Sequence, residues 1–209
     1  MKQLVIIGAS AMGREACSYA RDCGMKVKGF LDSRKAILRG HDDYPDIIGL
    51  VEDYKIANDD VFVCAVGDPQ DRKRYVDIIQ RRGGRFVSIL HPTAYIGHNV
   101  NVGEGCIVCP HATASADVNI GKHVIINVNA SINHDNQIGD FSTICPGARL
   151  AGRVKTGAFV FIGIGSTIIS DVEIGENVFV AAGAVVVKSH SSGMLMGVPA
   201  RETNRPSRR

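Results

Sequence analysis

Apolar residues recur at every sixth position between residues 96 and 186, and this is the strongest pattern in the chain. Only Thr156 interrupts the series, which runs through Ile96, Val102, Val108, Ala114, Ile120, Ile126, Ile132, Ile138, Ile144, Leu150, Thr156, Ile162, Ile168, Ile174, Val180 and Val186. The residue four places after each of the first fifteen is small or β-branched almost throughout, with Asn136 as the exception. An α-helix would return apolar residues every three or four positions and a simple strand every two, so the period of six fits neither.

A six-residue unit made of a short strand and a bend does fit this period, because the aliphatic residue can point inward while a glycine or asparagine turns the corner. Three such units close one triangular coil. Eighteen residues then advance the structure by one strand spacing of about 4.8 Å. The alternative is an ordinary β-sandwich, but its turns do not recur at a fixed interval of six. The pattern therefore predicts an all-β parallel β-helix over the second half of the chain.

The first ninety residues follow a different pattern, in which short apolar runs alternate with helical stretches. Strands are predicted at 2–7, 27–31, 61–66 and 86–90, and helices at 14–23 and 72–82. The first strand leads into the turn Gly8-Ala9-Ser10-Ala11-Met12-Gly13, and the second ends at Asp32. Strand, glycine-containing turn, helix, strand and acidic residue form the βαβ arrangement that binds phosphates at a helix N-terminus. About ninety residues suffice for one mononucleotide-binding half of a Rossmann fold.

The β-helical half resembles the left-handed β-helix of the hexapeptide-repeat acyltransferases. The repeats carry this resemblance, together with Gly197-Val198-Pro199-Ala200-Arg201, which is similar to the Gly-x-Pro-Ala-Lys/Arg element that closes those domains. The fold class is therefore predicted as an α/β Rossmann-like domain at 1–88, a left-handed β-helix at 89–201 and a basic tail at 202–209.

The two halves together resemble the PglD-like and NeuD-like sugar acetyltransferases of bacterial glycan synthesis, in which the N-terminal domain holds a UDP-linked amino sugar. The resemblance implies that Ser10, Ala11 and Met12 line the diphosphate or sugar, that Asp32 and Ser33 contact the uridine, and that Gly67 contacts the nucleotide. The chain departs from the commoner Gly-Gly-His or Ser-Gly-His form at Ala11 and Met12.

His134 is the candidate catalytic residue, and Asp135 follows it directly in Asn133-His134-Asp135-Asn136. Acyl transfer from a thioester to an amine needs a base that works near neutral pH, and histidine suits this role. A neighbouring carboxylate can orient the ring and stabilise its protonated form. Other histidines occur in the same repeats, namely His98, His111 and His123, and the spacing alone leaves His98 and His111 open as alternatives. The resemblance assigns the base to His134 and the helper to Asp135.

The resemblance also implies that acetyl-CoA is the co-substrate and that it lies between the β-helices of a homotrimer whose active sites are shared between chains. The positions that match its contacts are Asn127, Thr143, Gly152, Ile164 and Ala182. No metal is expected, because no two histidines of the repeats stand five residues apart as in the γ-class carbonic anhydrases that share the fold.

Composition narrows the classes of partner. The formal charge is +3, but residues 201–209 hold four arginines and one glutamate, so the remainder is balanced and no nucleic-acid surface is indicated. No apolar run of eighteen residues and no export signal stands out, and a cytoplasmic location is expected. Cys106 and Cys109 form a lone Cys-x-x-Cys, in which packing explains Cys106 without redox or metal chemistry.

The sequence therefore predicts an acetyltransferase that moves the acetyl group of acetyl-CoA to the amine of a UDP-linked 4-amino-4,6-dideoxy sugar. Two alternatives stay open: O-acetylation of a sialic-acid-like sugar, and a nucleotide-sugar-binding protein of the same fold without catalysis.

Overall fold

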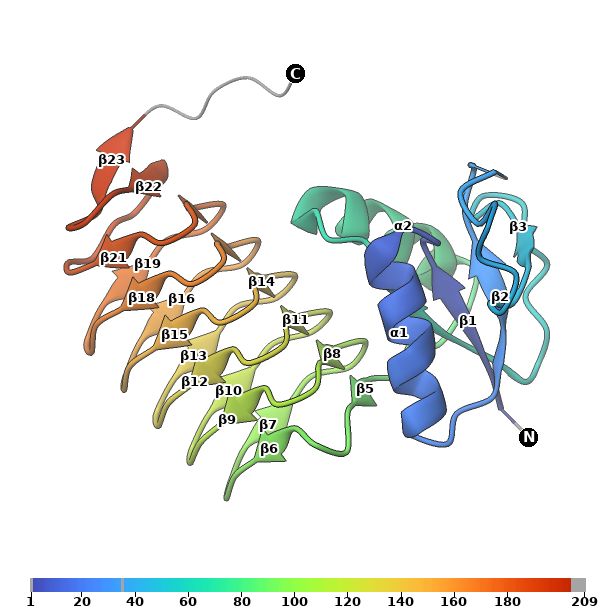
Figure 1. Cartoon of the computed structure of the whole chain (residues 1–209), viewed down its shortest axis with the longest axis horizontal. Helices are drawn as coiled ribbons and strands as arrows, with labels where there is room; N and C mark the ends of the chain where they lie inside the picture. The colour runs from blue at the N-terminus through green and yellow to red at the C-terminus, as the bar shows by residue number, and fades with distance from the viewer. Residues whose placement is uncertain (1, 35, 204–209) are drawn as a thin grey trace.

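The computed structural model describes residues 2–34 and 36–203, so the tail predicted at 202–209 lies outside the described part of the chain except for its first two residues. The N-terminal unit is a four-stranded parallel sheet in the order β3-β2-β1-β4, with two helices (Figure 1). Its elements are β1 (Gln3–Ile7), α1 (Ala11–Asp22), β2 (Val27–Leu31), β3 (Ile47–Gly49), β4 (Asp60–Cys64) and α2 (Pro69–Arg81).

Both helices begin three residues earlier than the sequence pattern predicted, because their N-cap residues lie further upstream. Ser10, in extended backbone, precedes α1. The carboxylate of Asp68 precedes α2 and accepts hydrogen bonds from the backbone N–H groups of Gln70 and Asp71, both at 3.0 Å. The strand predicted at 86–90 is also different: Phe86 makes a single bridge to Phe62, and the chain then leaves this sheet.

The second half is a left-handed parallel β-helix whose strands of two or three residues form three faces (Figure 1). Face I contains β5 (Ile89–Leu90), β8 (Ile107–Val108), β11 (Ile125–Ile126), β14 (Thr143–Ile144), β17 (Phe161–Ile162), β20 (Phe179–Val180), β22 (Met194–Met196) and the antiparallel β23 (Arg201–Thr203). Face II contains β6 (Tyr95–Ile96), β9 (Thr113–Ala114), β12 (Ser131–Ile132), β15 (Arg149–Leu150), β18 (Thr167–Ile168) and β21 (Val185–Val186). Face III contains β7 (Asn101–Val102), β10 (Asn119–Ile120), β13 (Gln137–Ile138), β16 (Lys155–Thr156) and β19 (Glu173–Ile174).

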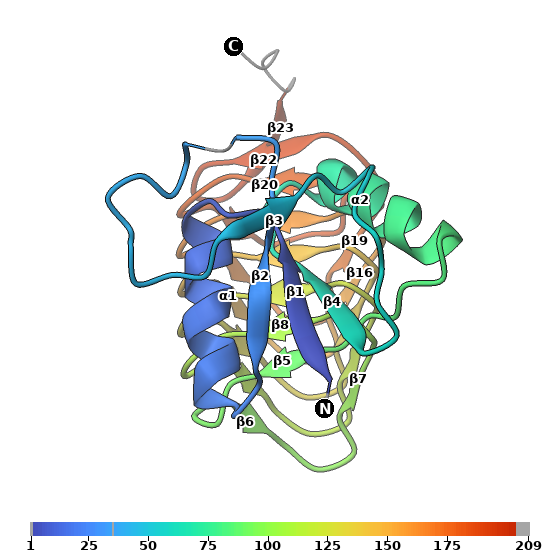
Figure 2. The same cartoon turned by 90° about the vertical axis from the view of Figure 1, so that its right-hand side faces the viewer.

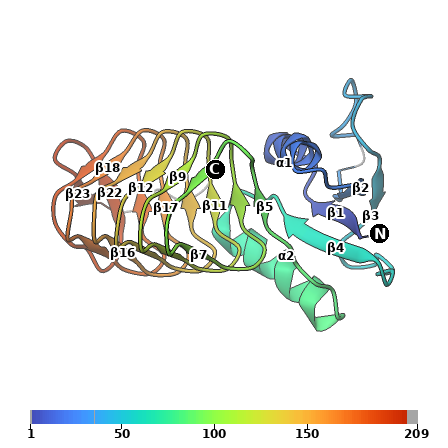
Figure 3. The ribbon, with the colours of Figure 1, turned by 90° about the horizontal axis from the view of Figure 1, so that it is seen from below.

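The register confirms the predicted coil of eighteen residues. Ile126 pairs with Val108 in the coil before it and with Ile144 in the coil after it. The aliphatic column and the small residues four places later fill the interior, where Ile132, Ile162 and Val154 are fully buried. Figure 3 shows the coils following one another along the axis, with the N-terminal unit beside β5.

The N-terminal unit packs on face I because the outward residues of that face are apolar. Ile89, Ile107 and Ile125 are buried in one cluster with Cys17 and Ala20 of α1. The outward residues of face III are polar instead, namely Asn101, Asn119, Gln137, Lys155 and Glu173. In Figure 2 the four-stranded sheet lies in front of β5 and β8.

Arg72 of α2 joins the two halves and is fully buried. Its guanidinium donates to five backbone carbonyls and one hydroxyl, from both halves of the chain: Val66, Gly67, His123, Phe141, Ser142 and the Thr143 side chain. Burial lowers the pKa of Arg72 to about 10, so it stays charged at neutral pH. The orientation of the N-terminal unit is thus fixed by a buried cation bound to backbone oxygens.

Candidate active site

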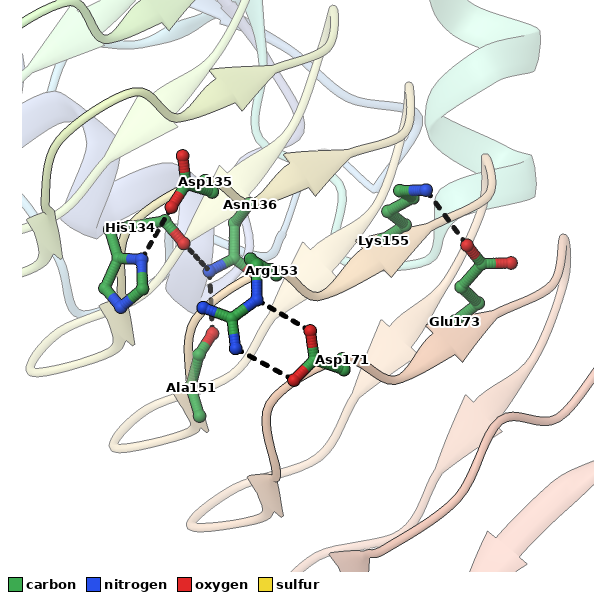
Figure 4. Close-up of polar contacts among 8 residues, drawn as sticks. All are labelled: His134, Asp135, Asn136, Ala151, Arg153, Lys155, Asp171 and Glu173. Carbon is green, nitrogen blue, oxygen red and sulfur yellow. Dashed lines mark hydrogen bonds and ion pairs between the residues drawn. The ribbon is translucent and has the colours of Figure 1, made fainter.

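His134 and Asp135 lie at the corner between β12 and β13, where face II turns into face III (the II/III corner; Figure 4). Asp135 has a positive φ of 61°, a conformation that the corner of each coil repeats. The Nδ1 atom of His134 lies 2.7 Å from Oδ2 of Asp135. Since a carboxylate can only accept, this bond places a proton on Nδ1 and leaves Nε2 as the free basic nitrogen. About half of each side chain is exposed, so Nε2 can be reached from outside.

Gly152 makes room for the His134 ring. It occupies the same corner position one coil later, eighteen residues on. A Cβ atom added to Gly152 would lie 2.6 Å from Nε2 and 3.0 Å from Nδ1 of His134. The ring therefore lies across the Gly152 backbone. By contrast, Ala116 follows His98 in this column, so His98 lacks such a glycine.

Two exposed ion pairs lie on the two coils that follow this histidine (Figure 4). Arg153 donates through Nε and Nη2 to both oxygens of Asp171, at 2.6 and 2.9 Å. Lys155 lies 3.0 Å from Glu173 on face III. The hydrogen bond from Arg153 lowers the pKa of Asp171, and the hydrogen bond to Asp171 together with the charge of Asp135 raises the pKa of Arg153. Arg153 is thus a cation near the Asp135 carboxylate, and Asp171 holds its guanidinium in place.

A separate cavity of about 530 Å³ lies in the N-terminal unit at the carboxyl ends of its strands. It brings together four of the six residues predicted to bind the nucleotide sugar: Ser10, Asp32, Ser33 and Gly67. Ala11 and Met12 are the first residues of α1 and do not line it; Met12 packs against the apolar cluster around α1. This crevice is where open α/β sheets bind nucleotides.

Both oxygens of the Asp32 carboxylate accept hydrogen bonds from other groups of this chain. Oδ2 accepts from the Ala9 N–H and from Nη2 of Arg34, and Oδ1 accepts from the backbone N–H and Nε of Arg34, all at 2.9 to 3.0 Å. Burial raises the pKa of Asp32, but these hydrogen bonds outweigh burial and hold it below its usual range. Asp32 therefore acts on the cavity through Arg34, because its carboxylate holds the Arg34 guanidinium at the cavity wall.

The cavity residues that sequence reasoning missed include Arg34, Arg74 and Tyr75. Arg74 lies over the Tyr75 ring and donates to its hydroxyl at 2.9 Å. The two arginines give the cavity cationic groups suited to a diphosphate. The available signal was local: Arg34 stands two residues after the acid that ends β2, and Arg74 stands in the first turns of α2.

Comparison with known protein families gives one match in each half of the chain. The model of the PglD N-terminal domain matches residues 3–79, and the bacterial transferase hexapeptide model matches residues 153–188. PerB from Caulobacter crescentus, solved with CoA and GDP-perosamine, is 29% identical with a TM-score of 0.90 over 98% of each chain. The acetyltransferase domain of PglB from Neisseria gonorrhoeae is 26% identical with a TM-score of 0.89, over 97% of this chain and all of that domain. The chain therefore carries a match to the PglD N-terminal domain followed by a match to bacterial transferase hexapeptide repeats, the two parts that the resemblance to the PglD-like acetyltransferases predicted.

Curated relatives share shorter stretches with this chain. The UDP-3-O-acylglucosamine N-acyltransferase of Methylococcus capsulatus is 34% identical over 71 residues, which are 34% of this chain and 19% of that protein. The chain spans about a quarter or less of the length of the curated relatives that it matches.

The residues that the PglD-like resemblance assigns to acetyl-CoA fall into three places. Gly152 lies under His134 at the II/III corner. Asn127, Ile164 and Ala182 lie at the other edge of face II, where face I turns into it (the I/II corner), and Ile164 is 59% exposed. Thr143 does not join either group: it is buried between the two halves, where its hydroxyl donates to the Gly67 carbonyl at 3.1 Å.

Across residues 2–34 and 36–203, no group of three His, Cys, Asp or Glu side chains is arranged to hold a metal ion. Cys106 and Cys109 are buried free thiols, and burial raises the pKa of both. No described helix combines the length and apolar character that crossing a membrane requires.

Proposed function

We propose that the protein transfers the acetyl group of acetyl-CoA to the amine of a nucleotide-linked 4-amino-4,6-dideoxy sugar, with UDP as the nucleotide. The observation that carries this proposal is the His134–Asp135 pair, whose free Nε2 lies at an exposed corner of a hexapeptide-repeat β-helix. The relatives support it, because PerB was solved with CoA and an amino-sugar nucleotide and PglB carries an acetyltransferase domain. These substrates imply a cytoplasmic enzyme.

In the proposed reaction, the sugar amine attacks the thioester carbonyl while Nε2 of His134 takes a proton from the amine nitrogen. Asp135 stabilises the imidazolium that forms, through the bond at Nδ1. The new N–C bond forms, the C–S bond breaks, and the proton on Nε2 passes to the departing CoA thiolate. His134 and Asp135 therefore return to their starting states. The net change is that the amine exchanges one hydrogen for the acetyl group, and CoA receives that hydrogen as its thiol.

We further propose a homotrimer in which two chains share each site. The N-terminal unit covers face I, whereas His134 lies at the II/III corner, so the cavity of one chain does not open beside its own base. Three triangular coils that turn face II toward a threefold axis would place the II/III corner of one chain next to the I/II corner of the next. That arrangement would unite Gly152 of one chain with Asn127, Ile164 and Ala182 of its neighbour. Sedimentation at micromolar concentration should give a mass three times that of one chain, and the mass of a single chain would refute the trimer.

The activity is tested by incubating the protein with acetyl-CoA and a panel of acceptors, following thiol release and product mass. The panel holds UDP- and GDP-linked 4-amino-4,6-dideoxy sugars and free sialic acid. One added acetyl on a UDP-amino sugar is the expected result, and acetylation of the GDP sugar alone would correct the nucleotide. Acetylated sialic acid would replace the proposal with O-acetylation, and silence across the panel would favour a binding protein.

His134→Ala should lower kcat about 10² to 10⁴-fold, because general base catalysis contributes that much. His98→Ala is the matched control, since His98 occupies the same corner column two coils earlier. Its kcat should stay within about twofold of the wild type. Near-normal turnover of His134→Ala would remove His134 from the reaction while leaving the fold intact.

A further inference from the structure

The inward column at the II/III corner contains one polar residue, and it lies in the coil that carries His134. The five residues of this column are Val100, Val118, Asn136, Val154 and Val172. Asn136 is fully buried, as are Val118 and Val154 on either side of it. The coils before and after therefore build the same corner with a plain apolar side chain.

The Asn136 amide holds the backbone of the corner on which the catalytic pair stands. Its Nδ2 donates to the Asn133 carbonyl at 2.7 Å and, at a longer 3.3 Å, to the His134 carbonyl. It also donates at 2.8 Å to the Ala151 carbonyl of the next coil, beside Gly152 (Figure 4). One amide thus ties the segment that carries His134 to the segment on which the His134 ring rests.

The other end of the same amide has no partner. Oδ1 of Asn136 is buried without a hydrogen bond. Turning the amide over would point that oxygen at the carbonyl oxygens, which can only accept, so the orientation is fixed by the three acceptors. A buried polar atom without a partner destabilises a fold and calls for an explanation. The four valines show that coil formation does not need the amide.

We propose that Asn136 is a positioning residue for the His134–Asp135 pair. By holding the carbonyls of Asn133, His134 and Ala151 it fixes the backbone from which the His134 ring projects, and so keeps Nδ1 against Asp135 and the ring across Gly152. This inference rests on the proposed role of His134 as base. Sequences that break a local pattern at a cost in stability do so most often at functional sites.

The test replaces Asn136 by the residue that the rest of the column uses. Asn136→Val should fold with a Tm close to that of the wild type, because it removes the unpaired Oδ1 and also the donor to the Asn133 and Ala151 carbonyls, and the coils with valine at this place form without that donor. With the acceptor found by the panel, kcat should fall about tenfold or more, since small displacements of a catalytic group are costly. KM for acetyl-CoA should change by less than about twofold. Asn136→Ser should recover part of kcat, because a hydroxyl can still donate one hydrogen bond to these carbonyls.

A second measurement needs no substrate and separates this inference from the proposed function. Proteins labelled with ¹⁵N in histidine report the tautomer of His134 by NMR, with His134→Ala used to assign its signals. The wild type should carry the proton on Nδ1, and Asn136→Val should show a mixture of tautomers. Val118→Ala is the control: it removes packing from the same column one coil earlier, so it should lower Tm without altering kcat or the His134 tautomer.

An unchanged His134 tautomer in Asn136→Val would overturn the inference, even if the acceptor panel stays silent. So would wild-type kcat in that variant. A joint loss of Tm and kcat that Val118→Ala reproduces would assign Asn136 a role in stability alone.

Discussion

Within a single coil, the II/III corner and the corner between faces III and I (the III/I corner) have the same backbone but opposite surroundings. Asp135 at the first has a φ of 61°, and Phe141 at the second has a φ of 58°. Asp135 and its neighbour His134 are half exposed and hydrogen-bonded to each other. Phe141 is buried and stacks at 5.4 Å on Phe159 of the next coil. The repeat fixes the conformation, and the side chain at each corner decides between packing and chemistry.

The III/I corner is covered by α2, and its column binds the two halves together. His123 stacks on Phe141 at 4.9 Å and meets Phe86 edge-on at 4.8 Å. Arg72 donates to the backbone of both His123 and Phe141. Among the described residues no helix covers the II/III corner, and the His134 and Asp135 side chains there are half exposed.

Arg72→Met should break the covered corner. The change leaves carbonyls from both halves without a donor, and each buried unpaired group costs about 1–3 kcal/mol, so a loss of at least about 3 kcal/mol is expected. Urea unfolding followed by circular dichroism should show this loss, with the N-terminal unit unfolding first. Arg81→Met, on the exposed end of the same helix, should leave the transition in place. A single unshifted transition in Arg72→Met would show that the guanidinium does not hold the halves together.

His123→Phe should remove a pH dependence from the covered corner. Burial, opposed only in part by Glu104, lowers the pKa of His123 to about 4, below its unfolded value of about 6.5. Between these values the unfolded chain binds a proton that the folded chain refuses, so stability falls as pH drops from about 6.5 to 4, by about 3 kcal/mol in all.

Phenylalanine keeps the stack of this corner, because Phe141 and Phe159 occupy the same column with the same positive φ. The difference in unfolding free energy between His123→Phe and the wild type should therefore grow as pH falls from 7 to 4.5. A constant difference over that range would mean that His123 titrates normally in the folded protein.

Gly152→Ala should disturb the open corner without unfolding it. The added Cβ would collide with the His134 ring, and displacement of the ring should lower kcat about 10- to 100-fold. Ala116 shows that the coil accepts alanine at this place. Ser170→Ala, one coil later in the same column, serves as control and should retain kcat. Full activity of Gly152→Ala would mean that the ring works in another position.

Asp171→Asn should have the smallest effect, a decrease in kcat of a few fold. Losing its carboxylate frees Arg153 to turn toward Asp135 and to compete with Nδ1 of His134. If this is the cause, the double variant Asp171→Asn with Arg153→Gln should recover the wild-type rate in the acetyl-transfer assay. A double variant as slow as the single one would rule out competition by Arg153.

The repeat made most of the β-helix predictable, because one spacing sets coil, register and inward column together. His134 and Asp135 were predictable as a pair because they are adjacent in sequence, and the period of eighteen also implies that Gly152 lies next to His134. The contacts of Arg72 were not predictable, since its acceptors on the β-helix lie 51 to 71 residues away and are mostly backbone carbonyls. The pairing of Asp32 with Arg34 and the burial of Thr143 were not predicted for a related reason, because each depends on the partner that tertiary packing supplies.

The eighteen-residue register also sets how far apart two positions lie along the axis of the β-helix. Each coil advances the structure by about 4.8 Å while returning every column to the same face and corner. Insertion or deletion of one whole coil between the N-terminal unit and residue 134 would shift the histidine by that single step and keep its orientation. An insertion or deletion that is not a multiple of eighteen residues would move the histidine to a different place around the coil. Evolution within this architecture can therefore adjust the distance along the axis between the N-terminal unit and His134 only in discrete increments.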